Sequence, residues 1–182
     1  MTLETTTIQD LMIINPAVFN DERGYFFEAY NKEKFCALGI TIDFVQDNQS
    51  FSKKETLRGL HYQNPPHAQT KLVRVLQGEI IDVAVDLRKD SATFGHSFSI
   101  KLTAENKKQL LVPQGFAHGF SVISETAVVL YKCDQYYNKA SEGGIRFDDA
   151  QLNIDWGMDL KEAIVSEKDL VLPGFNSCNS EF

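Results

Sequence analysis

Short runs of apolar residues, many of them β-branched, recur along the chain and predict a protein built mainly of strands. Gly, Pro, Asn or Ser residues, which are typical of turns, separate these runs. We expect strands at residues 25–30, 42–45, 57–63, 71–76, 79–87, 96–102, 109–112, 120–123 and 127–131. The Gln77-Gly78 pair between two of these runs indicates a tight turn, and therefore a hairpin of residues 71–87.

Helical patterns are few and short. Asn31 is a suitable N-cap for a helix over residues 32–38, and Gly39 supplies the left-handed residue that ends it. A second helical signal covers residues 160–164, and residues 166–169 follow it. Many short strands with a few peripheral helices are typical of a sandwich or barrel. Because 182 residues without repeat or linker suit one core, we expect a single domain over residues 1–182.

Charge and composition exclude several classes of protein. The chain has 18 Lys and Arg against 25 Asp and Glu, a net charge of −7, which disfavours general nucleic-acid binding. No apolar run reaches the length of a membrane span, and the first residues lack a signal-peptide pattern. The widely spaced Cys36, Cys133 and Cys178 predict free thiols, which suit a reducing compartment. We expect a cytoplasmic protein with neither a nucleic-acid nor a membrane partner.

Two histidines are candidates for a functional site. The period of two along residues 57–63 places Gly59, His61 and Gln63 on one face of a strand, where His61 either completes a core hydrogen bond or faces a cavity. Lys71 begins the next strand and is close enough in sequence to reach the same space. His118 lies between small residues in the run 113–120, which allows a close approach of backbone to ligand.

Metal binding is a natural use of histidines in a small barrel, yet the ligand set here is incomplete. A facial triad needs a second histidine or a carboxylate beside His61, and Gln63 occupies the place two residues on. Amides are poor ligands for transition metals. The pattern therefore favours acid/base chemistry without a metal or other cofactor.

Several longer motifs, taken together, resemble one family. They are residues 21–28, 44–48, 57–61, 71–73, 82–88, 113–120 and 131–133, in this order along nearly the whole chain. They resemble the dTDP-4-dehydrorhamnose 3,5-epimerases, whose fold is a cupin-like jelly-roll β-barrel. The resemblance implies inversion of carbons 3 and 5 of a nucleotide-linked 4-keto-6-deoxy sugar, and a homodimer in which the N-terminal segment completes the partner's sheet and pocket.

The resemblance also implies roles for four catalytic residues. His61 matches the base that removes a proton α to the ketone, and Asp169 matches the carboxylate that pairs with it. Lys71 matches the cation near the ketone oxygen, where an enolate develops. Tyr131 matches the proton donor on the opposite face, which inversion requires.

Further residues match substrate-binding positions of the family. Their chemistry suits a nucleoside diphosphate sugar. The cations among them can bind the phosphates, and the aromatic ring of Tyr137 can lie against the base. These positions are Arg23, Glu28, Gln46, Asp47, Asn48, Arg58, His118, Tyr137, Glu142 and Lys168.

Alternative functions share parts of this pattern. Related enzymes invert carbon 3 alone or act on other nucleotide-linked 4-keto-6-deoxy sugars, and motif matching does not separate them. A non-catalytic sugar-nucleotide-binding cupin would lack the base or the acid, whereas His61, Lys71, Tyr131 and Asp169 are all present. A metal-dependent cupin oxygenase is a further alternative, which a metal assay on the purified protein would test.

Overall fold

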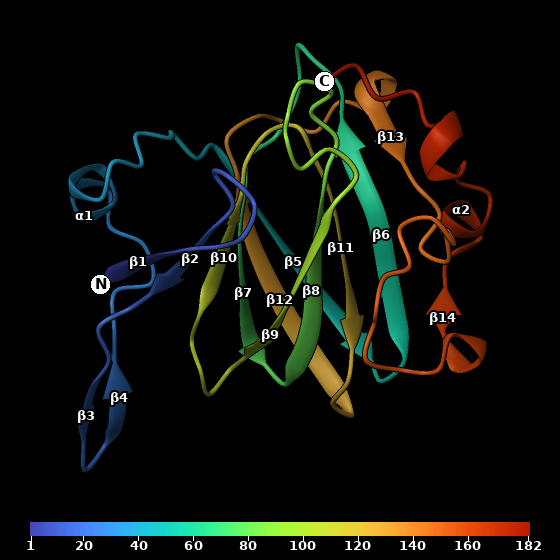
Figure 1. Cartoon of the computed structure of the whole chain (residues 1–182). Coiled ribbons are helices and arrows are strands. Elements are labelled where there is room, and N and C mark those ends of the chain that lie inside the picture. Colours follow the sequence, from blue (N-terminus) through green and yellow to red (C-terminus); the bar gives the residue numbers. More distant parts are fainter.

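The computed structural model describes residues 1–182 and contains two large β-sheets packed face to face, with a small hairpin to one side (Figure 1). The expected mainly β fold of the jelly-roll kind is confirmed. The sheets form a sandwich whose edges are open, rather than a closed barrel.

Both sheets are assembled from strands that are distant in sequence. The first has the order β1 (Thr2–Thr5), β2 (Met12–Asn15), β10 (Gln109–Val112), β7 (Lys71–Gln77), β12 (Thr126–Cys133) and β5 (Gln46–Lys53). The second has the order β13 (Glu142–Gly144), β6 (Thr56–Gln63), β11 (Phe116–Val122), β8 (Glu79–Asp86) and β9 (Ser97–Thr103), and β14 (Ile164–Val165) pairs with β6 in parallel. The separate hairpin consists of β3 (Phe19–Asp21) and β4 (Gly24–Phe26).

The turn at Gly78 joins the two sheets, so the predicted hairpin of residues 71–87 is wrong. β7 pairs with β10 and β12, whereas β8 pairs with β9 and β11. Gly78 has a φ of +77°, and a Cβ atom there would lie 2.0 Å from the Thr126 carbonyl oxygen. Val73 and Val75 of β7 and Ile80 and Ala84 of β8 belong to the same cluster between the sheets, so the two strands face each other across the core.

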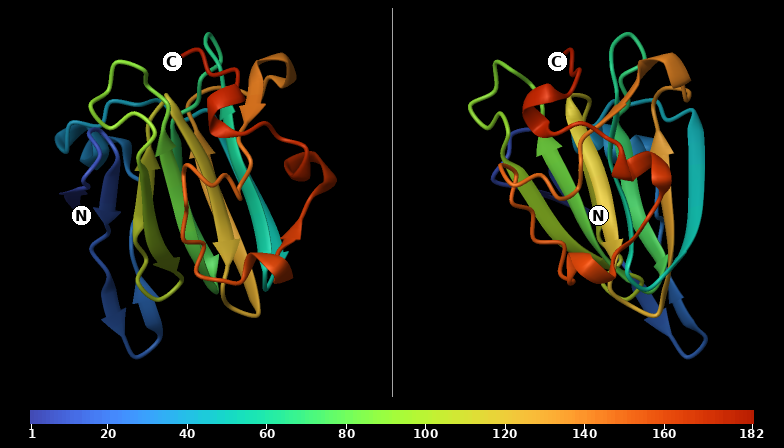
Figure 2. Two further views of the ribbon diagram at one scale, coloured as in Figure 1. Left: turned by 45° about the vertical axis from the view of Figure 1, so that its right-hand side comes forward. Right: turned by 90° about the vertical axis from the view of Figure 1, so that its right-hand side faces the viewer.

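The apolar side chains form three clusters. The largest lies between the sheets and includes Val73 and Val129 from the first sheet and Ile80 and Phe120 from the second. A second cluster covers the outer face of the second sheet, where the C-terminal residues 145–175 pack, with Trp156 fully buried (Figure 2). A third joins the outer face of the first sheet to the first helix.

The helices are short and peripheral, as expected. α1 (Lys32–Ala37) begins after Asn31, whose side chain accepts a hydrogen bond from the Lys34 amide, and Gly39 follows it with a φ of +85°. The others are α2 (Glu167–Leu170) and the 3₁₀ helices η1 (Lys139–Ser141), η2 (Leu160–Glu162) and η3 (Phe175–Ser177). None has the length and apolarity that crossing a membrane requires.

Some predicted strands have different bounds. Residues 42–45 form no strand, because Ile42 and Phe44 pack against the α1 cluster instead. The more polar residues that follow form β5. The predicted strand 25–30 is reduced to β4, and the predicted strand 120–123 belongs to β11, which begins at Phe116.

The loop between β8 and β9 is organised around a buried carboxylate. Asp86 accepts hydrogen bonds from the backbone and guanidinium of Arg88 and from the hydroxyls of Ser91 and Thr93, at 2.7–3.0 Å. Burial opposes ionisation of Asp86, but these hydrogen bonds outweigh it and lower its pKa to about 2. The ionised carboxylate therefore stabilises the fold.

We predict that Asp86→Asn lowers the free energy of unfolding by about 2 kcal/mol near neutral pH. The folded-state pKa lies below the ordinary value of 3.8. The stabilisation is therefore fully present above about pH 4 and is lost as the pH falls towards about 2. Urea denaturation of both proteins across this range measures the difference. A difference independent of pH would contradict the assignment.

Candidate active site

A cavity of about 630 Å³ lies between the sheets. Its walls come from β5, β6, β7, β11 and β12, together with residues 164–169. A smaller cavity of about 180 Å³ adjoins it and shares His61, Lys71 and Tyr131 with it. The combined space has the size of a site for a small organic ligand.

His61 and Asp169 form a hydrogen-bonded pair at the wall of this cavity. The His61 Nε2 atom lies 2.7 Å from Asp169 Oδ1, and the Gly59 amide donates to Asp169 Oδ2 at 3.2 Å. About a third of the His61 side chain is exposed, whereas Asp169 is buried. Burial opposes ionisation of Asp169, but the bonds from His61 and Gly59 outweigh it and lower its pKa. The hydrogen bond to Asp169 fixes the orientation of the His61 ring at the cavity wall.

The C-terminal segment brings Asp169 to β6. β14 pairs with the start of β6, and Ser166 then caps α2 by accepting a hydrogen bond from the Asp169 amide. The strict alternation of faces that was expected along β6, with Gly59 and His61 on the same face, is broken at Gly59. The ladder to β11 shifts register between His118 and Phe120, so Arg58 and His61 both line the cavity while Leu57 and Leu60 belong to the outer cluster.

Lys71 and Tyr131 reach the cavity from the first sheet. The Lys71 ammonium lies 6.0 Å from the centre of the Tyr131 ring and has no ion-pair partner. Desolvation lowers the pKa of Lys71, although the nearby Cys133, Asp82 and Glu142 oppose this effect. Burial raises the pKa of Tyr131, so its phenol stays protonated at neutral pH.

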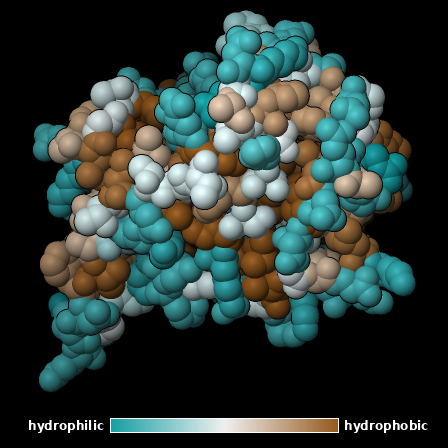
Figure 3. All heavy atoms as spheres, in the orientation of Figure 1, coloured by the Kyte–Doolittle hydropathy of each residue, from teal (hydrophilic) through white to brown (hydrophobic).

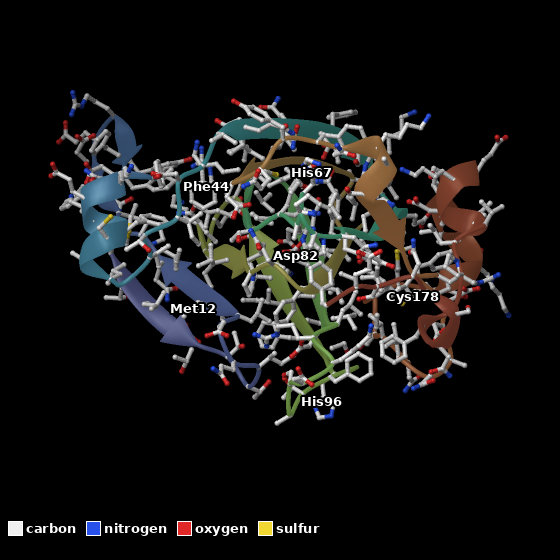
Figure 4. All side chains as sticks on the ribbon, turned by 90° about the horizontal axis from the view of Figure 1, so that it is seen from above. Met12, Phe44, His67, Asp82, His96 and Cys178 are labelled. Atoms are coloured by element: carbon white, nitrogen blue, oxygen red, sulfur yellow. The ribbon has the colours of Figure 1, made fainter.

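His118 lines the cavity beside His61, since the two are directly paired across β11 and β6. Its Nε2 atom lies 2.9 Å from Oδ1 of Asp82, and both side chains are buried. Asp82 stands near the middle of the molecule, whereas His96 lies at its edge (Figure 4). The site thus contains two histidine–carboxylate pairs.

The smaller cavity gathers polar residues that the sequence assigned to substrate binding. Gln46, Asn48, Tyr137 and Glu142 line it. The Tyr137 hydroxyl donates to Glu142 at 3.0 Å, and Lys168 forms an ion pair with the same carboxylate. Burial opposes ionisation of Glu142, but the bonds from Lys168 and Tyr137 lower its pKa overall. More than half of Tyr137 is exposed, which leaves its ring available to a flat ligand.

Arg58 and Lys168 place two cations on the wall of the larger cavity. The Arg58 Nε atom donates to the Ser52 hydroxyl at 3.1 Å, which orients the guanidinium. Two cations that can approach the same ligand suit a diphosphate group.

Three of the expected binding residues lie outside both cavities. Asp47 forms an ion pair with Lys132. Arg23 is almost fully exposed on the β3–β4 turn and pairs with Asp21, while Glu28 pairs with Lys34.

Sequence reasoning assigned no role to Ser52, which lines the larger cavity, or to Asp82, which forms a hydrogen bond with His118. An acidic residue within the apolar strand 80–85 was the available signal for Asp82. No group of three or more His, Cys, Asp or Glu side chains is arranged to hold a metal ion.

Comparisons with known proteins identify the family of this chain. The family model described as dTDP-4-dehydrorhamnose 3,5-epimerase matches residues 5–177. A curated relative of this name from Shigella flexneri is 49% identical, over 93% of each chain.

Solved structures of this family are similar to the chain in sequence and fold. The enzyme of this name from Elizabethkingia anophelis is 54% identical over 97% of each chain, with a TM-score of 0.92. The enzyme from Legionella pneumophila, in complex with dTDP-4-keto-L-rhamnose, is 46% identical over 97% of this chain and 93% of its own, also with a TM-score of 0.92. This chain therefore belongs to the dTDP-4-dehydrorhamnose 3,5-epimerase family.

Proposed function

We propose that the chain inverts carbons 3 and 5 of dTDP-4-dehydro-6-deoxy-D-glucose to give dTDP-4-dehydro-L-rhamnose, with His61 as the base and Tyr131 as the acid. The observation that carries this proposal is their placement. His61 lies on β6 of one sheet and Tyr131 on β12 of the other, and both line the same cavity. A sugar ring between the sheets has a base on one face and an acid on the other, as inversion requires.

Proton transfer at each carbon follows from the groups around the cavity. His61 removes the proton α to the ketone, and Asp169 stabilises the imidazolium that results. The electron pair of the C–H bond moves towards the ketone oxygen, and the Lys71 ammonium stabilises the enolate. Tyr131 then delivers its phenolic proton to the carbon from the opposite face. Solvent returns both groups to their starting protonation states, so no atoms are gained or lost.

The nucleotide portion is proposed to bind along the wall of the larger cavity and in the smaller one. Arg58 and Lys168 supply positive charge for the diphosphate, and the exposed ring of Tyr137 supplies a surface for the base. Gln46, Asn48, Glu142 and His118 supply hydrogen-bonding groups for the nucleoside and sugar.

We propose that two copies form a dimer through the β3–β4 hairpin. The hairpin extends away from both sheets (Figure 1), and an isolated two-stranded hairpin is marginally stable in water. Phe19, Tyr25 and Phe26 on it are more than half exposed, and hydrophobic side chains lie above its hydrophilic tip (Figure 3). Covering them with a partner subunit would bring Arg23 and Glu28 towards the partner's cavity.

The location proposed for the enzyme is the cytoplasm. Cys36, Cys133 and Cys178 are all free thiols, which persist in a reducing compartment. An activated nucleotide sugar is also a substrate expected in that compartment.

We predict that His61→Ala lowers kcat by about 10²–10⁴-fold without loss of the fold, because the imidazole faces the cavity and not the core. Turnover of dTDP-4-dehydro-6-deoxy-D-glucose and the thermal midpoint of the variant measure both effects. His96→Ala, on the exposed β8–β9 loop, is the matched control and should retain full activity. Normal turnover by a folded His61→Ala protein would refute the base assignment.

We predict that Tyr131→Phe lowers formation of the L-sugar by about 10²-fold or more while proton loss from the substrate continues. NMR in heavy water follows deuterium at carbons 3 and 5 together with the product. Tyr136→Phe, an exposed tyrosine nearby, is the control. Deuterium at both carbons with a new L-sugar in the wild type supports double epimerisation. Label at carbon 3 alone would instead identify a 3-epimerase, and no label at either would contradict the proposed activity.

If the site is shared between subunits, we predict that mixing two impaired variants, Arg23→Ala and His61→Ala, restores activity. Arg23→Ala should weaken activity because the partner's cavity loses a cation, and His61→Ala removes the base. In a mixed dimer, the cavity with intact His61 receives Arg23 from the other subunit. Co-refolded variants should therefore show turnover above that of either variant alone. A monomer by light scattering, or no regain, would refute the shared site.

A further inference from the structure

Asp82 is a fully buried carboxylate that lies behind the cavity wall. It comes from the middle of β8, between Ile80 and Ala84, which both belong to the core between the sheets. Its Oδ1 atom bonds His118, while Oδ2 is buried and has no hydrogen-bond partner. Asp82 does not line the cavity, so its effect on a ligand must pass through other residues.

A buried carboxylate with one unpartnered oxygen is unfavourable unless nearby groups compensate its charge. Ordinary core residues at this position of an apolar strand would be Val or Ile. The two groups able to compensate Asp82 are His118, which it contacts, and Lys71, whose charge interacts with it from the opposite sheet. Both of these residues line the cavity.

The hydrogen bond from His118 determines which ring nitrogen carries a proton. A carboxylate oxygen only accepts hydrogen bonds, so Nε2 of His118 is the donor. The neutral ring then has Nδ1 free as an acceptor. Since His118 is directly paired with His61 across the two strands, rotation of its ring would change the space beside the base.

Lys71 has several titratable neighbours but no ion-pair partner. They are Tyr131 and Cys133 on β12, His61 on β6, His118 on β11, Asp82 on β8 and Glu142 on β13. Desolvation favours the neutral amine, and Asp82 is one of the two carboxylates that oppose it. Glu142 is already neutralised by its ion pair with Lys168. Asp82 is therefore the carboxylate without another cation beside it.

We propose that Asp82 is a positioning residue for the epimerase reaction: its hydrogen bond holds His118 in one tautomer and orientation beside His61, and its buried carboxylate lies behind the cavity wall on the sheet opposite Lys71. The inference rests on the proposed function, in which His118 binds the sugar and Lys71 stabilises the enolate. It adds a residue that touches neither the substrate nor the reacting atoms.

The kinetic test uses Asp82→Asn, which keeps the shape of the side chain and removes its charge. We expect kcat to fall by about 10²-fold, and the alkaline limb of its pH profile to move to lower pH by about one unit, because Lys71 loses its proton more easily. Asp86→Asn is the matched control, since Asp86 is also buried at the end of β8 but lies outside the cavity. It should leave kcat and the pH profile unchanged.

A second measurement does not depend on turnover. Nitrogen-15 NMR of labelled histidines reports the tautomer of His118, assigned with His118→Gln. We expect a proton on Nε2 in the wild type and a mixture of tautomers in Asp82→Asn. Wild-type protein without turnover would refute the proposed function and leave this readout intact. An Nδ1-protonated ring in the wild type, or an Asp82→Asn protein with unchanged kcat and pH profile, would overturn the role of Asp82.

Discussion

The bond between His61 and Asp169 is the interaction on which the site depends. A buried carboxylate is unfavourable without hydrogen bonds, and Asp169 obtains them from the imidazole and from the Gly59 amide. Both donors lie on β6, while Asp169 comes from the C-terminal segment that packs outside the same sheet. The outer hydrophobic cluster therefore serves the chemistry as well as stability, because it holds the segment that carries the acid against the strand that carries the base.

The jelly-roll connections explain why the reactive groups surround a ligand. The chain changes sheets at Gly78, so β7 and β8, which are neighbours in sequence, lie in opposite sheets. Lys71 and Tyr131 project from one sheet, and His61 and His118 project from the other. A planar enolate between them is reached from both faces. A flat sheet or a helical bundle face would present all four groups to one side of the substrate.

Enclosure of charge is the main energetic cost of this arrangement. Desolvation raises the pKa of Tyr131 and so keeps its phenol a proton donor, whereas it lowers the pKa of Lys71 and so disfavours the charged ammonium. Asp82 and Asp169 are the buried anions that accompany these groups. Apolar residues at the two positions would pack well, and the site would lose its charge balance.

The strand pattern, the capped helix at Asn31 and the motifs around His61 and His118 follow from local sequence, because β-branched runs, caps and glycines act over a few residues. Sequence alone did not establish that residues 71–87 divide between two sheets, that Gly59 shifts the phase of β6, or that Asp82 meets His118. These features depend on contacts between segments up to about a hundred residues apart, where burial of whole faces outweighs local preference. The sequence by itself determined a mainly β protein with histidines suited to acid/base chemistry, and the epimerase activity followed from the resemblance of its motifs to one family. Only the tertiary structure decided which side chains share the cavity, since desolvation and hydrogen bonding there arise from residues distant along the chain.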